Sequence, residues 1–413
     1  MTYTLFTPNP ARATLPSQLH GGGNPQAFHA QLPGYGPTPL WDCPAVAEAL
    51  GVARVLVKDE SSRLGLPSFK MLGASWATAR AIQRHWLDGG LDGEAGAPQL
   101  NQLRTDLAAS SGRRLVAATD GNHGRGVARM AAMLGLGCAI FVPAGTAGAR
   151  IRSIESEGAT VEVVEGSYDD AIARSAQEAD GDSLVISDTS WEGYVQTPSD
   201  VVHGYSTLFL EIDQALARSS RPSPGVLALQ AGVGSFAAAG LAHYGSPGSA
   251  LRTSARRTTA QRPRTVVVEP VAANCLMRSA QSGGITEAPG PHRSTMAGLN
   301  CGLPSMLAWP TVANAADHYL AIDDEPAYAA MRLLAGSGIA AGESGAAALG
   351  ALLAVVDPQD REALGLRADA TVLLVNTEGA TDPVNYLAQV GSSADDVLAG
   401  AAARRSAAGV AAM

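Results

Sequence analysis

Short apolar runs alternate with helix-length stretches through most of this 413-residue chain. The runs predict buried strands, because each is bounded by turn residues and is rich in Val, Ile and Leu. The clearest candidates are Val55–Val57, Leu115–Ala118, Ala139–Val142, Val161–Val164, Leu184–Ile186, Val226–Leu229, Thr265–Val268 and Val372–Val375. The stretches between them predict helices such as Ala74–Arg84, Gly124–Leu134, Ala147–Glu157 and Tyr168–Ala179. Buried strands that alternate with helices are typical of an α/β protein built on parallel sheets.

Several predicted strands end in turns that are rich in Gly, Asp or Asn. These turns are Thr119-Asp120-Gly121-Asn122-His123-Gly124, Gln230-Ala231-Gly232-Val233-Gly234-Ser235 and Asn376-Thr377-Glu378-Gly379. In open α/β sheets, ligands bind outside the carboxyl ends of the strands. We therefore expect the functional site at these turns.

Two segments lack this regular pattern and predict surface insertions. Leu87–Arg114 is polar and Gly-rich, and Leu251–Arg264 is rich in Arg, Ser and Thr. The second could contact an anion, but a solvated loop is the simpler interpretation. The tail Ser406–Met413 consists mainly of small residues and is expected to fray.

Composition narrows the class of protein. The length suggests two or three domains, or one large α/β unit with a subdomain, and 46% hydrophobic residues suffice for sizeable cores. A net charge of −9 argues against nucleic-acid binding. The N-terminal residues lack the pattern of a signal peptide, and no apolar run is long enough to span a membrane. We expect a soluble, cytoplasmic protein.

The four cysteines, Cys43, Cys138, Cys275 and Cys301, show no Cys-x-x-Cys spacing. This pattern predicts neither a metal site nor a disulfide framework. Cys275 and Cys301 flank the rim of one motif and could approach each other, but free thiols are expected in the cytoplasm.

Lysine is scarce. Of the 29 lysines and arginines in the chain, only Lys58 and Lys70 are lysines. Arginine serves surface charge equally well, but only lysine can form a Schiff base. Lys70 lies in Pro67-Ser68-Phe69-Lys70-Met71-Leu72-Gly73, where an apolar run gives way to a helical one. Scarcity could also reflect biased coding, so the neighbouring motifs must decide whether Lys70 has a chemical role.

Two of the turns are candidates for ligand binding. The Gly232-Val233-Gly234-Ser235 turn follows a strand and opens the helix Phe236–Ala242, a position where free N–H groups bind phosphate. An ordinary tight turn would look the same. Asp120 and Asn122 could cap the helix that follows them, or meet a ligand as an acid–base group and an amide, and both roles are compatible.

A lysine, a phosphate-binding turn and an Asn turn together suggest pyridoxal phosphate. The chain resembles the fold-type-II pyridoxal-phosphate enzymes and, within them, the diaminopropionate ammonia-lyase family. The motifs that carry the resemblance include Ser68–Gly73, Thr119–Gly124, Asp188-Thr189-Ser190-Trp191-Glu192-Gly193-Tyr194, Gly232–Ser235, Met296–Gly302, Gly342–Gly345 and Thr377–Pro383. The resemblance extends from about residue 35 to residue 390.

The resemblance implies a role for each motif. Lys70 would form the Schiff base, Asn122 would contact the phenolic oxygen of the cofactor, and the backbone of Gly232, Val233, Gly234 and Ser235 would bind its phosphate. Asp120 and Asp188 would lie near the substrate and handle its protons and its second amine. The family places a hydroxyl residue at the ring nitrogen, whereas Asn376 stands at the aligned position, with Thr377 beside it. The ring-nitrogen partner therefore stays open between these two.

The resemblance also implies the architecture, which is two open, twisted, mostly parallel sheets flanked by helices. Residues 1–75 and 206–413 would form a large cofactor-binding domain, and residues 76–205 a smaller mobile domain. A homodimer is expected. Trp191 and Tyr194 could wall the site, although aromatics at such positions are more often core residues, and His123 is expected to be a structural turn residue.

The leading hypothesis is α,β-elimination of ammonia from 2,3-diaminopropionate, which gives pyruvate and two ammonia. Lys70 or Asp120 would remove the Cα proton, depending on the substrate's stereochemistry, and Asp120 or Asp188 would protonate the departing amine. Elimination from serine, threonine, 3-hydroxyaspartate or another β-substituted alanine needs the same residues and is the alternative. A catalytically silent cofactor-binding or regulatory protein is the third possibility.

Overall fold

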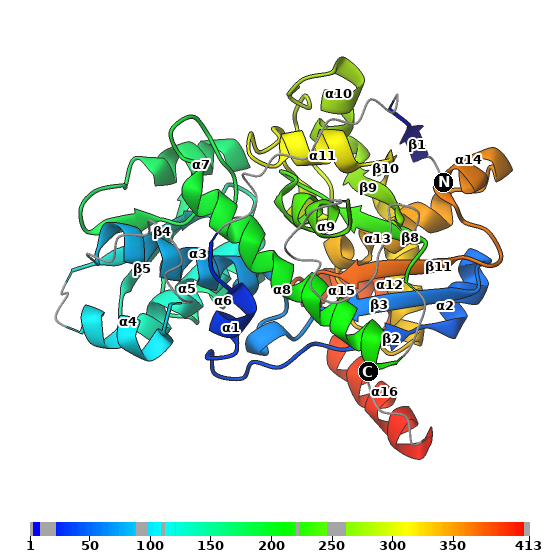
Figure 1. Ribbon diagram of the computed structural model, residues 1–413, viewed down its shortest axis with the longest axis horizontal. Helices are drawn as coiled ribbons and strands as arrows, with labels where there is room; N and C mark the ends of the chain where they lie inside the picture. Colours follow the sequence, from blue (N-terminus) through cyan, green and yellow to red (C-terminus); the bar gives the residue numbers. More distant parts are fainter. Residues whose placement is uncertain are drawn as a thin grey trace.

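The computed structural model describes residues 3–8, 22–87, 98–108, 112–119, 121–219, 223–245 and 262–408. Two sheets organise these residues (Figure 1). The larger sheet has seven strands in the order β1-β10-β9-β8-β11-β3-β2. Its strands are β1 (Tyr3–Phe6), β2 (Leu40–Asp42), β3 (Arg54–Asp59), β8 (Val226–Gln230), β9 (Arg264–Pro270), β10 (His318–Ile322) and β11 (Thr371–Asn376). Only the two edge strands, β1 and β2, pair antiparallel with their neighbours.

The smaller sheet has four strands in the order β6-β5-β4-β7, all parallel. They are β4 (Arg114–Ala118), β5 (Gly137–Pro143), β6 (Thr160–Val164) and β7 (Ser183–Val185). All eight strands expected from the sequence are present. The predicted architecture of two mostly parallel sheets flanked by helices is confirmed.

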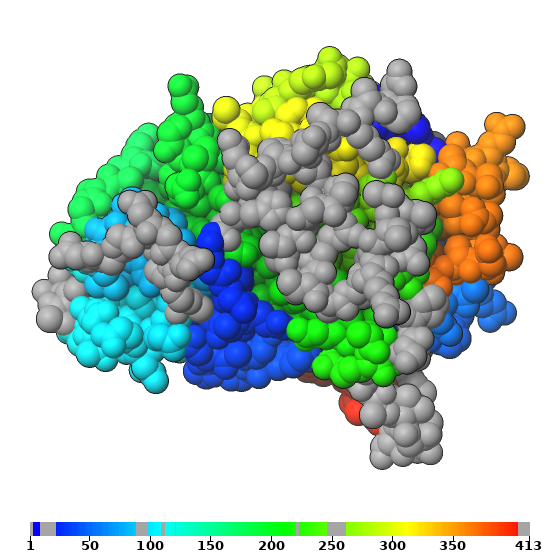
Figure 2. All heavy atoms as spheres, viewed as in Figure 1, coloured from blue at the N-terminus to red at the C-terminus, as the bar shows by residue number. Residues whose placement is uncertain are grey.

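Helices cover the faces of both sheets. Those around the smaller sheet are α3 (Lys70–His85), α4 (Leu100–Leu107), α5 (Asn122–Leu134), α6 (Gly148–Glu155) and α7 (Tyr168–Ala176). The others are α1 (Pro25–His29), α2 (Pro44–Leu50), α8 (Gln196–Arg218), α9 (Ser235–Gly245), α10 (Cys275–Ser282), α11 (Trp309–Ala315), α12 (Asp324–Gly336), α13 (Glu343–Ala354), α14 (Pro358–Leu364), α15 (Pro383–Val390) and α16 (Ala394–Ala408). Distant segments meet at the surface, where α14, orange in Figure 2, lies beside α2, blue. There Arg361 of α14 donates a hydrogen bond to the carbonyl of Leu50 in α2, 2.6 Å away.

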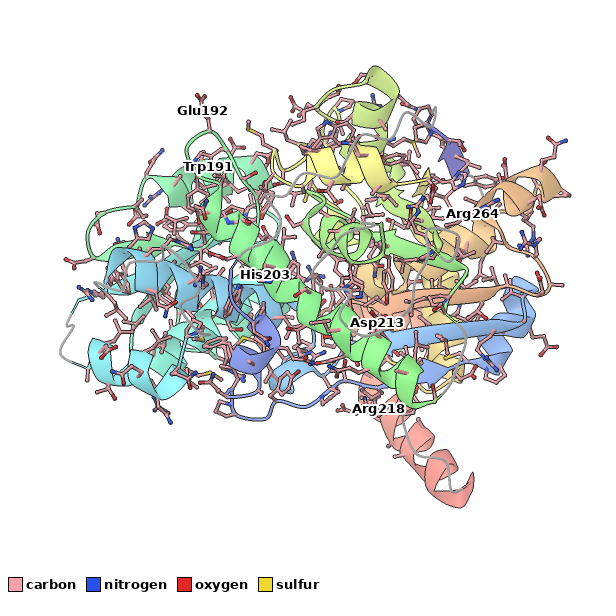
Figure 3. The ribbon with its side chains drawn as sticks, viewed as in Figure 1. Trp191, Glu192, His203, Asp213, Arg218 and Arg264 are labelled. Carbon is pink, nitrogen blue, oxygen red and sulfur yellow. The ribbon has the colours of Figure 1, made fainter. Side chains whose placement is uncertain are left out.

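Helix α8 crosses from the smaller to the larger part of the molecule, and His203, Asp213 and Arg218 mark its course in Figure 3. It packs against α3 where Gly73 faces Tyr205 and Gly204 faces Leu72. A Cβ on Gly204 would lie 2.6 Å from the Leu72 carbonyl oxygen, so the two helices touch through their backbones. This contact holds the first turn of α3, which begins with Lys70.

The predicted domain boundaries at 75/76 and 205/206 fall inside α3 and α8 respectively. The four strands of the smaller sheet all lie between them. One continuous hydrophobic core extends from the smaller sheet through α3 and α8 to the larger sheet, and includes Leu115, Trp76, Phe209 and Leu229. The boundaries and the mobility of the smaller domain stay predictions.

A buried cluster of charged side chains around Lys58 anchors β3 to α8. The Lys58 ammonium lies 2.6 Å from a Glu211 carboxylate oxygen, and Arg63 bonds both Glu60 and Glu211 at 2.7 Å. All four side chains are at most 1% exposed. Two cations and two carboxylates therefore balance within the core, and Arg63 is part of this buried ion-pair network. Within the described part of the chain, every helix is too short or too polar to cross a lipid bilayer.

Candidate active site

A cavity lies where the carboxyl ends of strands from both sheets converge. Its walls surround about 660 Å³ of space, open solvent included. Strand β8 reaches it with Gln230, Thr377 follows β11, Asn122 follows β4 and Asp188 follows β7. The other lining residues are Ser68, Phe69, Lys70, Tyr168, Gly232, Val233, Gly234, Ser235, Phe236, Ala297, Gly298, Leu299, Asn300, Cys301, Ser344 and Glu378.

Lys70 is the first residue of α3, and its side chain is 19% exposed. Its backbone N–H donates to the hydroxyl of Ser68 at 3.3 Å, which satisfies one of the free amides at the helix start. The ammonium lies 2.6 Å from a carboxylate oxygen of Asp188. The structure therefore brings together two candidate residues that are 118 positions apart in the sequence.

Asp188 is held on both of its oxygens, by Lys70 on one and by the Tyr168 hydroxyl, at 2.9 Å, on the other. Burial alone would raise the pKa of Asp188, but the charge of Lys70 and the hydrogen bonds from Lys70 and Tyr168 hold it far below its usual range. Asp188 is therefore a carboxylate at neutral pH, and the proton of this pair resides on Lys70.

The Gly232–Ser235 turn joins β8 to α9, and Ser235 is the first residue of that helix. Its hydroxyl donates to the backbone carbonyl of Asp188 at 2.7 Å, which fixes the turn beside the Lys70–Asp188 pair. A Cβ on Gly232 would lie 2.8 Å from Cys301 Sγ, and Gly234 has φ +100, in the left-handed region. The backbone N–H groups therefore border the cavity without side chains over them, as phosphate binding requires.

Asn122 and Thr377, on the cavity wall, each form a hydrogen bond with another side chain of the protein. The Asn122 amide nitrogen donates to a Glu378 oxygen at 2.5 Å, and the other Glu378 oxygen has no hydrogen-bond partner among the described residues. The Thr377 hydroxyl oxygen accepts a hydrogen bond from the amide nitrogen of Gln230 at 2.8 Å. An amide N–H of Asn122 and the hydroxyl proton of Thr377 therefore remain for a ligand.

Asn376 is not among the residues that line the cavity, and its contact with the cofactor stays a prediction. Its amide nitrogen donates to Asp59 at 2.9 Å and lies 3.4 Å from the carbonyl of Ala340. Asn376 is the last residue of β11, and Thr377, which follows the strand, lines the cavity. Of the two, only Thr377 lines the cavity, and its role as the ring-nitrogen partner stays a prediction.

The remaining candidates take structural positions. His123 is 1% exposed and its ring bonds the Ile186 carbonyl at 2.7 Å, while burial lowers the pKa of the imidazole. Trp191 and Tyr194 stack at 4.2 Å in the smaller part of the molecule, away from the cavity lining, and Figure 3 shows Trp191 beside the outward-pointing Glu192. Asp120 lies outside the described residues, so its role stays a prediction.

Cys275 and Cys301 lie near the same glycine but are not bonded to each other. Cys275 Sγ lies 3.8 Å from the Gly232 carbonyl oxygen, and Cys301 faces Gly232 from the loop that precedes α11. Both thiols are buried, and burial raises the pKa of Cys275 well above its usual value. The high pKa of Cys275 keeps that side chain a neutral thiol at neutral pH.

Sequence reasoning missed three residues of the wall, Tyr168, Gln230 and Glu378, as participants in the site. The sequence pattern predicts Tyr168 only as the start of a helix, and its place after the Gly166-Ser167 turn was the available signal. Gln230 is a polar residue closing an otherwise apolar strand, and it is 1% exposed. A buried polar side chain at the carboxyl end of a strand was the available signal.

These features define the class of protein. A lysine beside a carboxylate, bare backbone amides at a helix start, an amide donor and a hydroxyl donor match the aldehyde, phosphate, phenolic oxygen and ring nitrogen of pyridoxal phosphate. A family model described as pyridoxal-phosphate dependent enzyme matches residues 31–378. The chain belongs to that family, and pyridoxal phosphate is its cofactor.

The chain is similar to named diaminopropionate ammonia-lyases. That of Escherichia coli (strain K12) is 36% identical over 370 residues, covering 87% of this chain and 88% of the relative. That of Salmonella typhimurium (strain LT2) is 35% identical over 376 residues, covering 87% and 89% respectively.

Solved structures agree with the fold. The holo E. coli diaminopropionate ammonia-lyase superposes with a TM-score of 0.81 at 33% identity, covering 94% of this chain and 96% of that chain. The same enzyme in complex with D-serine gives a TM-score of 0.80 at 34% identity, covering 94% and 97%. A threonine deaminase of Solanum lycopersicum gives 0.67 at 18% identity, covering 94% and 96%, a likeness that concerns the fold alone.

Proposed function

We propose that this enzyme eliminates ammonia from 2,3-diaminopropionate and yields pyruvate and two ammonia. The observation that carries the proposal is the Lys70–Asp188 pair beside a phosphate-binding turn, in a chain 36% identical to diaminopropionate ammonia-lyase over most of its length. Pyridoxal phosphate, when bound, supplies the electron sink that stabilises negative charge at the substrate Cα. All other steps fall to the residues of this chain.

Lys70 would hold the cofactor through its amine, and that amine, when it is free, would lie within the cavity. A free amine at this position accepts the Cα proton from one face of the substrate. Removal from the opposite face needs a second base, which is the predicted role of Asp120. The enantiomer accepted therefore depends on which of these two residues faces the Cα proton.

Asp188 and Tyr168 control charge at the other reacting atom, the β-amine. An amine departs only when it is protonated, and a carboxylate beside it keeps it in the ammonium form. Asp188 is ionised while it pairs with Lys70, so we assign it the role of holding an ammonium group and not that of an acid at rest. The released enamine then hydrolyses in water to pyruvate and the second ammonia.

Lys70 variants test the proposal directly. Lys70→Ala removes the amine, and Lys70→Arg keeps the positive charge beside Asp188 but cannot form a Schiff base. Both are expected to abolish turnover of diaminopropionate, and neither is expected to show the visible absorbance of a cofactor bound covalently through lysine. Retention of both properties in Lys70→Ala would refute the mechanism.

The substrate is tested by comparing kcat/KM for L- and D-2,3-diaminopropionate with that for L-serine, L-threonine and 3-hydroxyaspartate. The proposal expects the diamine to be the preferred substrate. Preference for a hydroxy amino acid would keep the cofactor and Lys70 but move the function to a dehydratase. Cofactor binding without a spectral response to any of these amino acids would instead favour a catalytically silent protein.

We also propose that the chain forms a homodimer. Support comes from exposed apolar side chains between β9 and α11, where Val271, Ile285, Leu303 and Met306 are 42, 40, 44 and 50% exposed. Such side chains favour burial against another surface. Light scattering is expected to give twice the monomer mass, and Leu303→Asp with Met306→Asp to reduce it. The cytoplasmic location stays a prediction.

A further inference from the structure

Gln230 closes strand β8 with a buried amide that has an unusual set of neighbours. Its amide nitrogen lies 3.0 Å from the carbonyl oxygen of Ser344, 3.0 Å from that of Val375 and 3.3 Å from that of Gly345. It also lies 2.8 Å from the hydroxyl oxygen of Thr377. The side chain is 1% exposed, and its amide oxygen has no partner among the described residues.

These neighbours fix the orientation of the Gln230 amide. Backbone carbonyls only accept hydrogen bonds, so the nitrogen of the Gln230 amide, and not its oxygen, must face them. An amide nitrogen accepts no hydrogen bond, and the four acceptors share its two hydrogens. The hydroxyl proton of Thr377 therefore cannot be directed at Gln230.

The hydroxyl proton of Thr377 is left to point into the cavity. No hydrogen bond donated by this hydroxyl occurs within the residues that the structure describes, and Thr377 lines the cavity. A hydroxyl that receives a hydrogen bond on its oxygen donates its proton more readily, because the two bonds polarise each other. Thr377 thus presents a donor to the cavity, where the occupant must supply a lone pair.

We propose that Gln230 is a positioning residue that holds the Thr377 hydroxyl as a hydrogen-bond donor to the ring nitrogen of the cofactor and so keeps that nitrogen unprotonated. The inference rests on cofactor binding and on Thr377 as the ring-nitrogen partner, and it is independent of which amino acid is the substrate. Gln230 acts through Thr377 and touches no reacting atom.

The consequence is chemical selectivity. An unprotonated pyridine is a weaker electron sink than a pyridinium, so charge at Cα is discharged by loss of the β-substituent instead of being stored in the ring. Without Gln230, the hydroxyl can turn and donate to the carbonyls that the amide has left. Its lone pair would then face the ring nitrogen and favour protonation.

The test is the ¹⁵N chemical shift of holoenzyme loaded with pyridoxal phosphate labelled at the ring nitrogen, measured from pH 6 to pH 9 without substrate. The wild type is expected to show an unprotonated, hydrogen-bonded nitrogen throughout this range. Gln230→Met is similar in size but has no donor, and its resonance is expected to move toward the protonated position as the pH falls. Thr377→Ser keeps the hydroxyl and is expected to match the wild type.

A double-mutant cycle separates positioning from a general structural role. If Gln230 acts only through the hydroxyl, the ring-nitrogen shift of Gln230→Met/Thr377→Val should equal that of Thr377→Val alone. A further shift in the double variant would overturn the proposal, as would an unchanged resonance in Gln230→Met. Should Gln230→Met fail to fold, a protonated ring nitrogen in the wild type at neutral pH would by itself overturn it. No arm of the experiment requires turnover of diaminopropionate.

Discussion

Replacement of Gly232 by alanine is expected to weaken cofactor binding while the protein stays folded. The new Cβ would lie 2.8 Å from Cys301 Sγ and 3.1 Å from the Gly298 carbonyl oxygen, whereas ordinary contact begins at 3.4 Å. Either the turn or the facing segment must therefore shift by roughly half an ångström, because a close-packed interior leaves no spare room.

Such a shift takes at least one backbone N–H of the turn out of hydrogen-bonding geometry with the phosphate. A hydrogen bond to a charged group contributes about 1.5–3 kcal/mol. The dissociation constant for pyridoxal phosphate should therefore rise about 10- to 150-fold, since each 1.4 kcal/mol corresponds to a factor of ten.

The assay is titration of the apoprotein with pyridoxal phosphate, followed by the visible absorbance of the bound cofactor, with thermal unfolding of each apoprotein as the folding control. Cys301→Ala provides the matched control, because it removes the closest atom. Alone it should bind the cofactor nearly as the wild type does, and in Gly232→Ala/Cys301→Ala it should recover part of the lost affinity. Equal affinity in Gly232→Ala and the wild type, or no recovery in the double variant, would refute the reasoning.

Three further variants test other parts of the structure. In the apoprotein, Asp188→Asn removes a carboxylate with a lowered pKa. Burial raises the pKa of Asp188, but the charge of Lys70 outweighs burial and holds the pKa below its usual range. The wild type should therefore be more stable than Asp188→Asn at pH 7, and denaturant unfolding should show that difference disappearing as the pH falls below about 4. Lys58→Met leaves the buried Glu211 with one cation fewer and should lower the free energy of unfolding by about 3 kcal/mol in denaturant titrations, whereas a loss below about 1 kcal/mol would contradict a structural role. Burial raises the pKa of Glu269 to about 8, so folding retains a proton that the unfolded chain releases. Between about pH 5 and 8 the wild type should lose up to about 1.4 kcal/mol of stability per pH unit relative to Glu269→Gln, and parallel stability curves would show that Glu269 is already ionised.

The interior strands of the fold were predictable because their apolar residues are buried on both faces. Strand β8 is an example, since all five of its residues are buried and its sequence contains one polar residue. The edge strands β1 and β2 and the strand β10 were not predicted. Their runs are short or contain polar residues such as His318, and they become strands through pairing with distant neighbours. Helix α4 lies in a polar stretch that predicted only an insertion, where its buried Leu100, Leu103 and Leu107 form one apolar face.

The candidate site divides in the same way. Lys70, Asn122 and the Gly232–Ser235 turn lie in local motifs whose chemistry can be read directly. The residues that direct them could not be identified, because each contact joins distant segments, as where Asn122 meets Glu378 256 positions away. Which of Asn376 and Thr377 lines the cavity depends on how the chain leaves β11, and the sequence pattern does not reveal that direction.

The most direct measurement of the proposed function is the ratio of ammonia to pyruvate released by purified holoenzyme supplied with L- or D-2,3-diaminopropionate. The account predicts two ammonia for each pyruvate from the accepted enantiomer, and no product from Lys70→Ala. Release of one ammonia for each keto acid, seen only with hydroxy amino acids, would contradict it.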